Sequence, residues 1–171
     1  MALPVDRSLV DRLVVEHLPA GLHFALRLTG NEHSAEDVMQ EALCRVLRQW
    51  RSFRSEASFK TWLFQIVVNV DRDRRRRRTF ETLDREPACP LAEPADRLAV
   101  DEMDHRVRDE IGRLPDRQRE VAILCLGEGM RAEEVATILG ITEPNVHSSL
   151  HLARKRIAKA IGFDYAPQKR S

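Results

Sequence analysis

The stretch that decides the fold runs from Ser34 to Arg78, SAEDVMQEALCRVLRQWRSFRSEASFKTWLFQIVVNVDRDRRRRR. Its two ends have apolar residues at helical spacing, and a short loop rich in arginine and serine separates them. Both tryptophans and three of the six phenylalanines lie between Trp50 and Phe64, interleaved with Arg51, Arg54 and Lys60. Aromatic rings stack on bases and cationic side chains hold phosphates, so this mixture indicates binding of single-stranded nucleic acid.

Composition and hydropathy patterning predict an all-α protein. The chain of 171 residues is 43% hydrophobic and 32% charged, and it contains only seven glycines. Apolar residues recur every three or four positions over long stretches, whereas no segment alternates as a half-buried strand would. The length allows one domain or two small ones, each with a modest core.

The two helices of the deciding stretch each have an apolar and a polar face. We expect the first to begin after Ser34, an N-cap with Asp37 three residues later, and to end near Trp50. Its buried positions are Ala35, Val38, Met39, Ala42, Leu43, Val46, Leu47 and Trp50, and its exposed side carries Asp37, Gln40, Glu41 and Arg45. The second helix begins near Phe59 and ends near Arg78. Its buried stripe is Phe59, Trp62, Leu63, Ile66, Val67 and Val70, and its polar stripe is Gln65, Asn69, Arg72, Asp73 and Arg76.

A further helix is expected upstream, from about Arg7 to Leu28. Gly21 would weaken or break it, and Gly30 is a natural C-terminal stop. Residues 1–78 are therefore predicted to form an N-terminal helical bundle.

The composition changes after this bundle. Residues 79–97 contain three prolines, many acidic side chains and little periodicity, which predicts a flexible acidic linker. Helical periodicity returns near Leu98, and Pro115 suits the first turn of a new helix that reaches about Leu126 and stops at Gly127 or Gly129.

A helix-turn-helix is expected near the C-terminal end. A short helix over 131–139 is followed by a turn at Gly140, and Thr142 can cap a last helix that extends to about Ile161. Residues 98–171 thus form the second of two small helical domains.

The net charge of +1 hides an uneven distribution. Residues 1–78 have 14 basic and 10 acidic side chains, residues 79–104 have 2 and 8, and residues 105–171 have 12 and 9. Two basic segments joined by an acidic one carry information that the total charge does not, although each charged cluster alone is compatible with a merely solvated face.

Other site classes find no support in the sequence. Cys44, Cys89 and Cys125 are odd in number and widely spaced, so neither a disulfide framework nor a zinc site is indicated. Cys44 and Cys125 are expected to be small core groups, whereas Cys89 lies in the expected linker, where a redox role is the alternative. Neither a signal peptide nor an apolar run of about 18 residues is present, so we expect a cytoplasmic protein without membrane insertion. There is no nucleotide-binding, metalloprotease or nucleophile motif, so no catalytic residue, metal, cofactor or small-molecule substrate is expected.

Three ordered blocks of this chain resemble the small two-domain sigma factors of bacterial RNA polymerase, the extracytoplasmic-function group. The blocks are AEDVMQEALCRVL (35–47), FKTWLFQIVVNVDRDRRR (59–76) and LPDRQREVAILCLGEGMRAEEVATILGITEPNVHSSLHLARKRI (114–157). In the second, Trp62-Leu63, Ile66, Asn69 and Asp73 fall at the family's spacing. The resemblance implies a subunit that binds core polymerase and directs promoter-specific initiation.

The resemblance also implies roles for the N-terminal residues. The helix over 35–50 is similar to the one that docks on polymerase, here through Asp37, Gln40, Glu41 and Arg45; the alternative is a solvated face with a Glu41–Arg45 pair. The loop over 51–58 is similar to one that captures a flipped base of the minus-ten element, through Arg51, Phe53, Arg54, Ser55 and Glu56. Phe53 could instead pack in the core. Asn69, Arg72, Asp73 and Arg76 form one ridge that would follow promoter DNA, unless Asp73 only orients a neighbouring arginine.

In the last helix, the resemblance implies recognition of the minus-thirty-five element. The residues expected to contact it are Asn145, His147, Ser148, Ser149, Arg154 and Arg156. The chain departs from the family here, because positions that are usually basic hold His147, Ser149 and Leu152, which would weaken binding to duplex DNA.

The resemblance implies an anti-sigma factor as a further partner besides core polymerase and promoter DNA. Two alternatives remain open. A decoy would use the same fold to bind an inhibitor protein, and a free-standing regulator would bind duplex DNA without polymerase.

Overall fold

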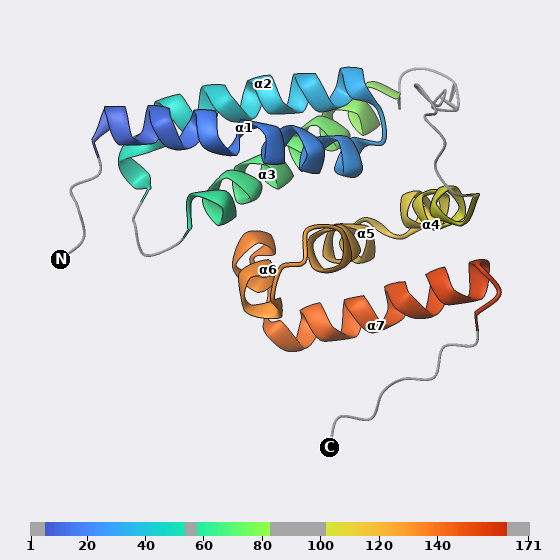
Figure 1. Cartoon of the computed structure of the whole chain (residues 1–171). Helices are drawn as coiled ribbons and strands as arrows, with labels where there is room; N and C mark the ends of the chain where they lie inside the picture. The colour runs from blue at the N-terminus through green and yellow to red at the C-terminus, as the bar shows by residue number, and fades with distance from the viewer. Residues whose placement is uncertain (1–5, 54–57, 83–101, 164–171) are drawn as a thin grey trace. The chain divides into compact units, whose positions relative to one another are not determined.

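The computed structural model describes residues 6–53, 58–82 and 102–163, and within these ranges all regular structure is helical. The prediction of an all-α fold is therefore confirmed. The chain divides into two compact units, of which the first contains α1, α2 and α3 and the second contains α4, α5 and α7 (Figure 1). Each unit is described separately below.

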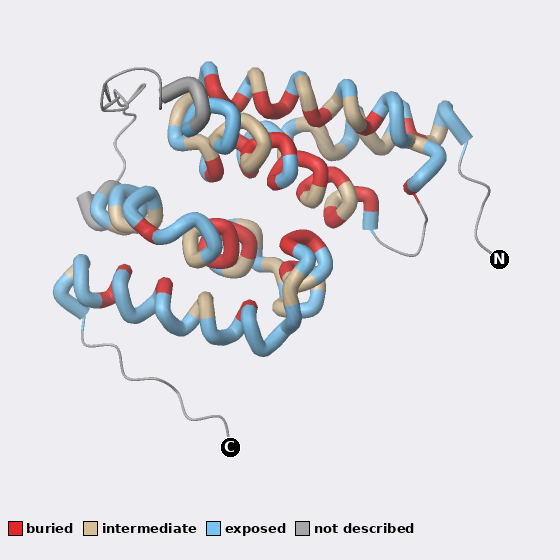
Figure 2. The backbone as a smooth tube through the Cα atoms, turned by 180° about the vertical axis from the view of Figure 1, so that it is seen from behind, coloured by how far each residue is buried: buried red, intermediate tan, exposed pale blue. Residues whose placement is uncertain are grey.

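The first unit is a bundle of three helices that all pack against one another: α1 (Arg7–Thr29), α2 (Glu32–Gln49) and α3 (Phe59–Thr82), with a 3-10 turn, Trp50–Ser52, after α2. Buried positions line the inner side of each helix (Figure 2). Phe24 of α1 stacks on Phe64 of α3 with ring centroids 4.2 Å apart. Burial of such rings is the main stabilising contribution in a bundle of this size.

The first helix is not broken at Gly21, contrary to the sequence-based expectation, and it also continues through Pro19. A Cβ at position 21 would lie 2.8 Å from Met39 Cε and 3.3 Å from Leu63 Cδ2. The absence of a side chain therefore lets α2 and α3 approach α1 closely, which compensates for the helix propensity that glycine lacks. Gly30 ends the helix as expected, with a positive φ of 80°.

The start of α2 differs from the prediction. Asn31, and not Ser34, is the N-cap: its side-chain oxygen accepts a hydrogen bond from the Ser34 N–H at 2.8 Å. Because α1 extends to Thr29 and Gly30 turns the chain, the next helix begins at once and places Ser34 in its first turn, where it is buried.

The buried face of α2 is narrower than the sequence predicts, and that of α3 is wider. Leu47 is 42% exposed and Cys44 is also exposed, so the expectation that both belong to the core was wrong. In α3 the core includes Thr61, Phe64, Val68 and Asp71 besides most of the predicted stripe, whereas Trp62 is half-buried. Each of the three helices packs against both others, so the difference lies in which side of each helix faces inward: the edge of α2 that carries Cys44 and Leu47 is turned to the outside.

The third helix continues to Thr82, beyond the expected end at Arg78. The run after Arg78 contains no proline or glycine before Pro87, and Thr79 Oγ1 donates to the Arg75 carbonyl at 3.0 Å within the helix. The first four residues of the predicted linker are therefore helical. The rest of that segment, with Cys89, lies outside the described residues.

The second unit is formed by α4 (Glu102–Arg113), α5 (Asp116–Ala122), α7 (Glu143–Ala160) and the first five residues, 132–136, of α6 (Ala132–Leu139). Its core joins Leu114, Ala122, Ala153 and Ile157, with Val107 and Ile111 packed against them. Pro115 is the N-cap of α5 and not its first residue, and the Arg119 N–H donates to its carbonyl at 2.9 Å. The helical path widens into a π-turn at Ile123–Gly127, so the expected α-helix to Leu126 stops at Ala122.

The helix-turn-helix has the expected plan. Gly140 ends α6 with a φ of 65°, a left-handed conformation that favours glycine, and Thr142 occupies the N-cap of α7. The last helix is amphipathic, since Val146, Ala153 and Ile157 are buried on one side.

Candidate functional site

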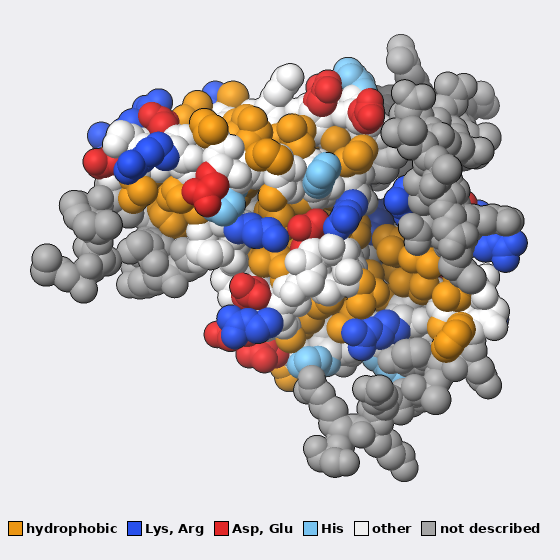
Figure 3. All heavy atoms as spheres, in the orientation of Figure 1, with side chains coloured by type: hydrophobic (Ala, Val, Ile, Leu, Met, Phe, Trp, Pro, Cys, Tyr) orange, Lys and Arg blue, Asp and Glu red, His pale blue; other side chains and the backbone are white. Residues whose placement is uncertain are grey.

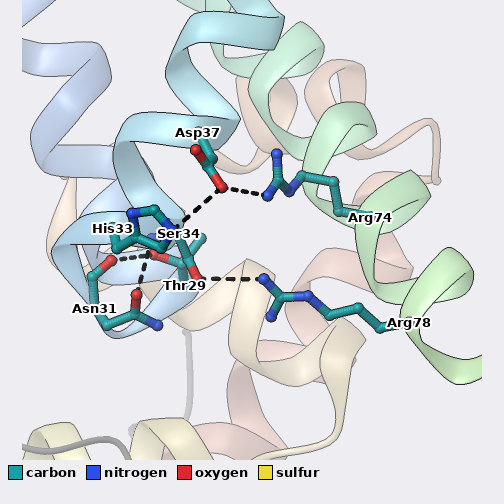
Figure 4. Close-up of polar contacts among 7 residues, drawn as sticks. All are labelled: Thr29, Asn31, His33, Ser34, Asp37, Arg74 and Arg78. Atoms are coloured by element: carbon teal, nitrogen blue, oxygen red, sulfur yellow. Dashed lines mark hydrogen bonds and ion pairs between the residues drawn. The ribbon is translucent and has the colours of Figure 1, made fainter. Parts of the chain in front are cut away.

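A polar seam joins α2 to α3 in the N-terminal unit. We define the α2–α3 seam by three contacts: Arg74 Nη2 to Asp37 Oδ2 at 2.6 Å, Arg45 Nη1 to Asp73 Oδ2 at 3.0 Å, and Arg78 Nη2 to Ser34 Oγ at 3.5 Å. Figure 4 shows two of them, with Asp37 facing Arg74 and Ser34 facing Arg78. The seam ties the side of α2 that we expected to meet polymerase to the helix that we expected to meet DNA.

The end of the seam near the start of α2 is ordered by short-range contacts. Thr29 Oγ1 donates to the Asn31 carbonyl at 3.1 Å, and Asn31 caps the helix through the Ser34 amide. The His33 imidazole lies 3.9 Å from Asp37 Oδ2, on the side away from Arg74 (Figure 4). Asp37 is thereby held between a cation on α3 and a histidine on its own helix.

Arg45 is the central residue of the seam. It donates to Glu41 Oε1 at 3.1 Å as well as to Asp73, and only 23% of its side chain is exposed. Burial alone would lower the pKa of Arg45, but the hydrogen bonds to Glu41 and Asp73 outweigh it and raise that pKa above its ordinary value. The guanidinium is therefore fully charged at any physiological pH.

The four residues expected to bind polymerase do not share one environment. Gln40 is exposed and Glu41 is half-exposed, so both present polar atoms to a partner. Asp37 and Arg45 are partly buried by their contacts with α3. The Glu41–Arg45 pair that was the alternative interpretation is present, but it belongs to a larger network and not to an isolated solvated face.

The loop after α2 contains an aromatic cluster. Phe53 is only 6% exposed, and its ring lies 5.4 Å from that of Phe59 and 5.2 Å from that of Trp62. Phe53 therefore packs in the core, as in the alternative interpretation, whereas its contact with a flipped base stays a prediction. His17 of α1 stacks on Phe59 at 5.6 Å, a partner that the sequence pattern did not indicate.

Of the other loop residues expected to contact DNA, the structure describes Arg51. Arg51 is exposed, with its guanidinium 5.1 Å from the centre of the Trp50 ring, a cation–π contact that leaves its donors accessible. Arg54, Ser55 and Glu56 lie outside the described residues.

The polar ridge of α3 is at the surface. Asn69 and Arg76 are exposed, and Arg72 and Asp73 are half-buried beside them. The run of five arginines goes around the helix, as expected: Arg74 pairs with Asp37, and Arg75 pairs with the buried Asp71 at 2.6 Å. Those two arginines stabilise the bundle, whereas Arg76 and Arg77 point outward.

The outer side of α7 carries most of the residues expected to meet duplex DNA. Asn145, His147, Ser148, Arg154 and Arg156 are exposed, and Ser149 is half-buried. Leu152 lies among them with 47% of its surface exposed, an apolar side chain without a cover in the described structure. Positive charge is thus confined to the second half of this helix.

The described residues hold no group of three metal-ligating side chains, and no helix among them is long and apolar enough to cross a membrane. Apolar side chains do reach the surface of the N-terminal unit (Figure 3), and Val15, Leu22, Leu26 and Leu47 are exposed there. Surface of this kind is typical of proteins that bind other proteins.

Comparison with known proteins matches both units to parts of one family. The family model for sigma-70 region 2 matches residues 13–81, and that for sigma-70 region 4 matches residues 104–157. The first match contains the whole α2–α3 seam, and the second contains α6 and α7 as far as Ile157.

Similar full-length proteins are known. The chain is 32% identical over 166 residues to the ECF RNA polymerase sigma factor EcfG of Rhodopseudomonas palustris, with 96% of this chain and 91% of that protein covered. It is 34% identical over 160 residues to the sigma factor SigM of Mycobacterium tuberculosis, covering 92% and 80%. Among solved structures, the sigma factor RpoE of Bartonella quintana in complex with the anti-sigma factor NepR matches with a TM-score of 0.79 and 26% identity, over 91% of this chain and 98% of that one.

Proposed function

The chain belongs to the extracytoplasmic-function sigma factors of bacterial RNA polymerase. From this membership we propose which of its residues bind polymerase and which bind promoter DNA. As a member of the family it binds core RNA polymerase and directs promoter-specific initiation of transcription. It is not an enzyme, since the polymerase performs the synthesis of RNA. The observation that best supports this function is that sigma-70 region 2 and sigma-70 region 4 are matched in this order along one chain.

We propose that the N-terminal unit, residues 1–78 together with the last turn of α3, binds core polymerase. Gln40 and Glu41 are the primary contacts, because they are the accessible residues of the expected set. An exposed amide and carboxylate suit a basic partner surface and speed its association by charge attraction. Asp37 and Arg45 support these contacts through their pairs with α3.

The ridge of α3 is proposed to contact the minus-ten element. Exposed Asn69 can hydrogen-bond a base edge or the backbone, and Arg72 and Arg76 can neutralise phosphates. Arg51 lies in the accessible loop before α3 and suits the same strand. Arg54, Ser55 and Glu56 stay proposed contacts of the flipped base on the strength of the family resemblance.

The C-terminal unit, residues 98–171, is proposed to read the minus-thirty-five element with α7. Asn145, His147, Ser148 and Ser149 are at or near the surface of the first half of the helix, where a recognition helix meets base edges. Arg154 and Arg156 contribute phosphate contacts further along. Because the first half lacks cations, we expect weak binding of this unit to duplex DNA by itself.

An anti-sigma factor is the proposed inhibitor, and the cytoplasm, where core polymerase works, is the proposed location. The similar RpoE of Bartonella quintana was solved with the anti-sigma factor NepR. The exposed apolar residues of α1 and α2 give a protein partner of this kind surface to cover.

The test is reconstitution of transcription. Purified protein and core polymerase are incubated with genomic DNA, and the 5′ ends of the transcripts are sequenced. We expect starts that share a minus-ten and a minus-thirty-five sequence and that depend on the protein. A decoy would bind an anti-sigma factor but give no such transcripts, and a free-standing regulator would bind duplex DNA tightly without polymerase.

A further inference from the structure

The guanidinium of Arg45 lies between two carboxylates that belong to different surfaces. Its Nε donates to Glu41 on α2 at 3.1 Å, and its Nη1 donates to Asp73 on α3 at 3.0 Å. Because most of the Arg45 side chain is covered, solvent and salt screen these contacts less than they screen a fully exposed pair. Arg45 therefore connects the exposed edge of α2 to the polar ridge of α3.

Asp73 in turn stands between two arginines. Its Oδ2 accepts from Arg45, while its Oδ1 lies 3.7 Å from Arg76 Nη2. The Arg76 side chain is 70% exposed, and a separation of 3.7 Å is too long for a hydrogen bond. Arg45 is thus the stronger partner of Asp73, and while it holds that carboxylate, Arg76 is only partly neutralised.

We infer that Arg45 is a positioning residue that couples polymerase binding to promoter contact. It does so by deciding how much of the negative charge of Asp73 acts on Arg76. This inference rests on the proposed function, in which Glu41 faces polymerase and Arg76 faces DNA. The inference is not about the contact of Glu41 with polymerase or that of Arg76 with DNA, but about the coupling free energy between these two contacts.

The direction of the coupling follows from the charges. Glu41, Arg45, Asp73 and Arg76 carry two negative and two positive charges, which cancel. When a basic group of polymerase pairs with Glu41, the other three keep a net charge of +1, and this favours the approach of a DNA phosphate. The coupling acts equally in the other direction. When a DNA phosphate pairs with Arg76, Asp73 keeps only Arg45 as its partner and binds it more strongly. Arg45 then binds Glu41 less strongly, and Glu41 becomes available to polymerase.

The double variant Arg45→Gln with Asp73→Asn tests the coupling against a simple bracing of two helices. The probe is fork-junction DNA of a promoter found by transcript sequencing, bound to holoenzyme. In Arg45→Gln, Asp73 has only Arg76 as its partner, and we expect binding about tenfold weaker, the size of one contact to a charged group. Adding Asp73→Asn frees Arg76 and should restore the affinity to within about threefold of the wild type.

The outcomes separate clearly. If Arg45 only braces α2 against α3, the double variant lacks the same pair and stays as weak as Arg45→Gln, which would overturn the inference. A wild-type holoenzyme that fails to bind the probe would instead overturn the proposed function. The matched control is Arg48→Gln, which removes an exposed arginine from the same helix and should leave the affinity within about twofold.

A second measurement applies even where Arg45→Gln does not fold. Asp73→Asn alone leaves Arg76 without its competing carboxylate, so holoenzyme with this variant should bind the probe more tightly. The slope of the logarithm of the binding constant against the logarithm of salt concentration should become steeper by at most about 0.7 to 0.9, because Arg76 then gives its whole charge to the phosphate and no longer shares it with Asp73. An unchanged slope contradicts the coupling, because it would mean that Asp73 does not compete with the phosphate for Arg76.

Discussion

The carboxylate of Asp37 on α2 and the guanidinium of Arg74 on α3 approach to 2.6 Å, although the two residues are 37 positions apart in sequence. About a third of each side chain is exposed, so the pair is partly screened and partly desolvated. A contact of this kind contributes to stability and at the same time holds the start of α2 against α3.

Replacement of Asp37 by Asn should lower the free energy of unfolding by about 1 kcal/mol, since the partly buried Arg74 loses its carboxylate. Chemical denaturation of the full chain measures the change, and a double-mutant cycle with Arg74→Gln isolates the pair. The matched control is Asp11→Asn, because Asp11 forms an exposed pair with Arg7 at 3.5 Å and should contribute almost nothing. Equal effects of the two substitutions would mean that the contact with α3 adds no stability.

Phe53→Ala should destabilise the N-terminal unit by about 3 kcal/mol, because it opens a cavity beside Phe59 and Trp62. Phe53→Leu removes less volume and keeps an apolar side chain, so it should cost only about half as much and keep promoter opening. Thermal unfolding and permanganate reactivity of the promoter are the two measurements. A stable Phe53→Leu protein that no longer opens the promoter would indicate that the ring does contact a base.

Gln40→Arg with Glu41→Arg should weaken binding to core polymerase by more than about tenfold, since two repulsive charges face the basic partner surface. Fluorescence anisotropy of the labelled protein with core enzyme measures the affinity. Glu36→Arg is the control, as an exposed carboxylate on the same helix outside the proposed contact. An unchanged core affinity in the double variant would refute the assignment of this edge of α2.

Asn69→Ala and Arg76→Ala should each reduce promoter opening by about tenfold while core binding stays intact, because both side chains are exposed on the polar ridge of α3 that we propose contacts DNA. Permanganate footprinting and core-binding titration separate the two effects. The control for loss of a charge is Arg12→Ala on α1, at an exposed site away from the ridge. A parallel loss of core binding would show that α3 contacts the polymerase and not the DNA.

Leu152→Arg should strengthen binding of the protein to duplex DNA with the minus-thirty-five sequence. The exposed leucine lies on the side of α7 that carries Ser149 and Arg156, and a cation there adds one phosphate contact. The salt slope should steepen by about 0.9. Gel-shift titration over a range of salt concentrations measures both quantities. An unchanged affinity would place this side of α7 away from the DNA.

Much of the bundle could be predicted because its helices follow hydrophobic periodicity. The faces of α2 and α3 are set by residues three and four apart, and Gly30 and Gly140 mark helix ends by their positive φ. The errors arose where a distant neighbour decides the outcome. The N-cap of α2 moved to Asn31 because α1 runs to Thr29, and Cys44 is exposed because no helix of the bundle covers that edge.

The places of the proposed site residues along their helices were predictable from spacing, whereas the network of contacts that joins them was not. Spacing placed Glu41 next to Arg45 and Asp73 next to Arg76, since these pairs lie on single helices. The contacts of Asp37 with Arg74 and of Arg45 with Asp73 depend on how α2 crosses α3, which side-chain spacing within one helix does not reveal. Phe53 shows the same limit, because an aromatic ring in a basic loop suits a base and a core equally well until its neighbours are known.

The contact at Gly21 has a consequence for engineering the protein. Met39 of α2 and Leu63 of α3 both approach the space that a Cβ at position 21 would occupy, so an added methyl group would act as a wedge among three helices at once. Met39 directly precedes Gln40, and the thioether is flexible enough to yield by rotation before the backbone moves. Residue 21 is therefore a place where one carbon atom on α1 changes the packing of Met39 and Leu63 without altering any residue of the surface proposed to meet polymerase.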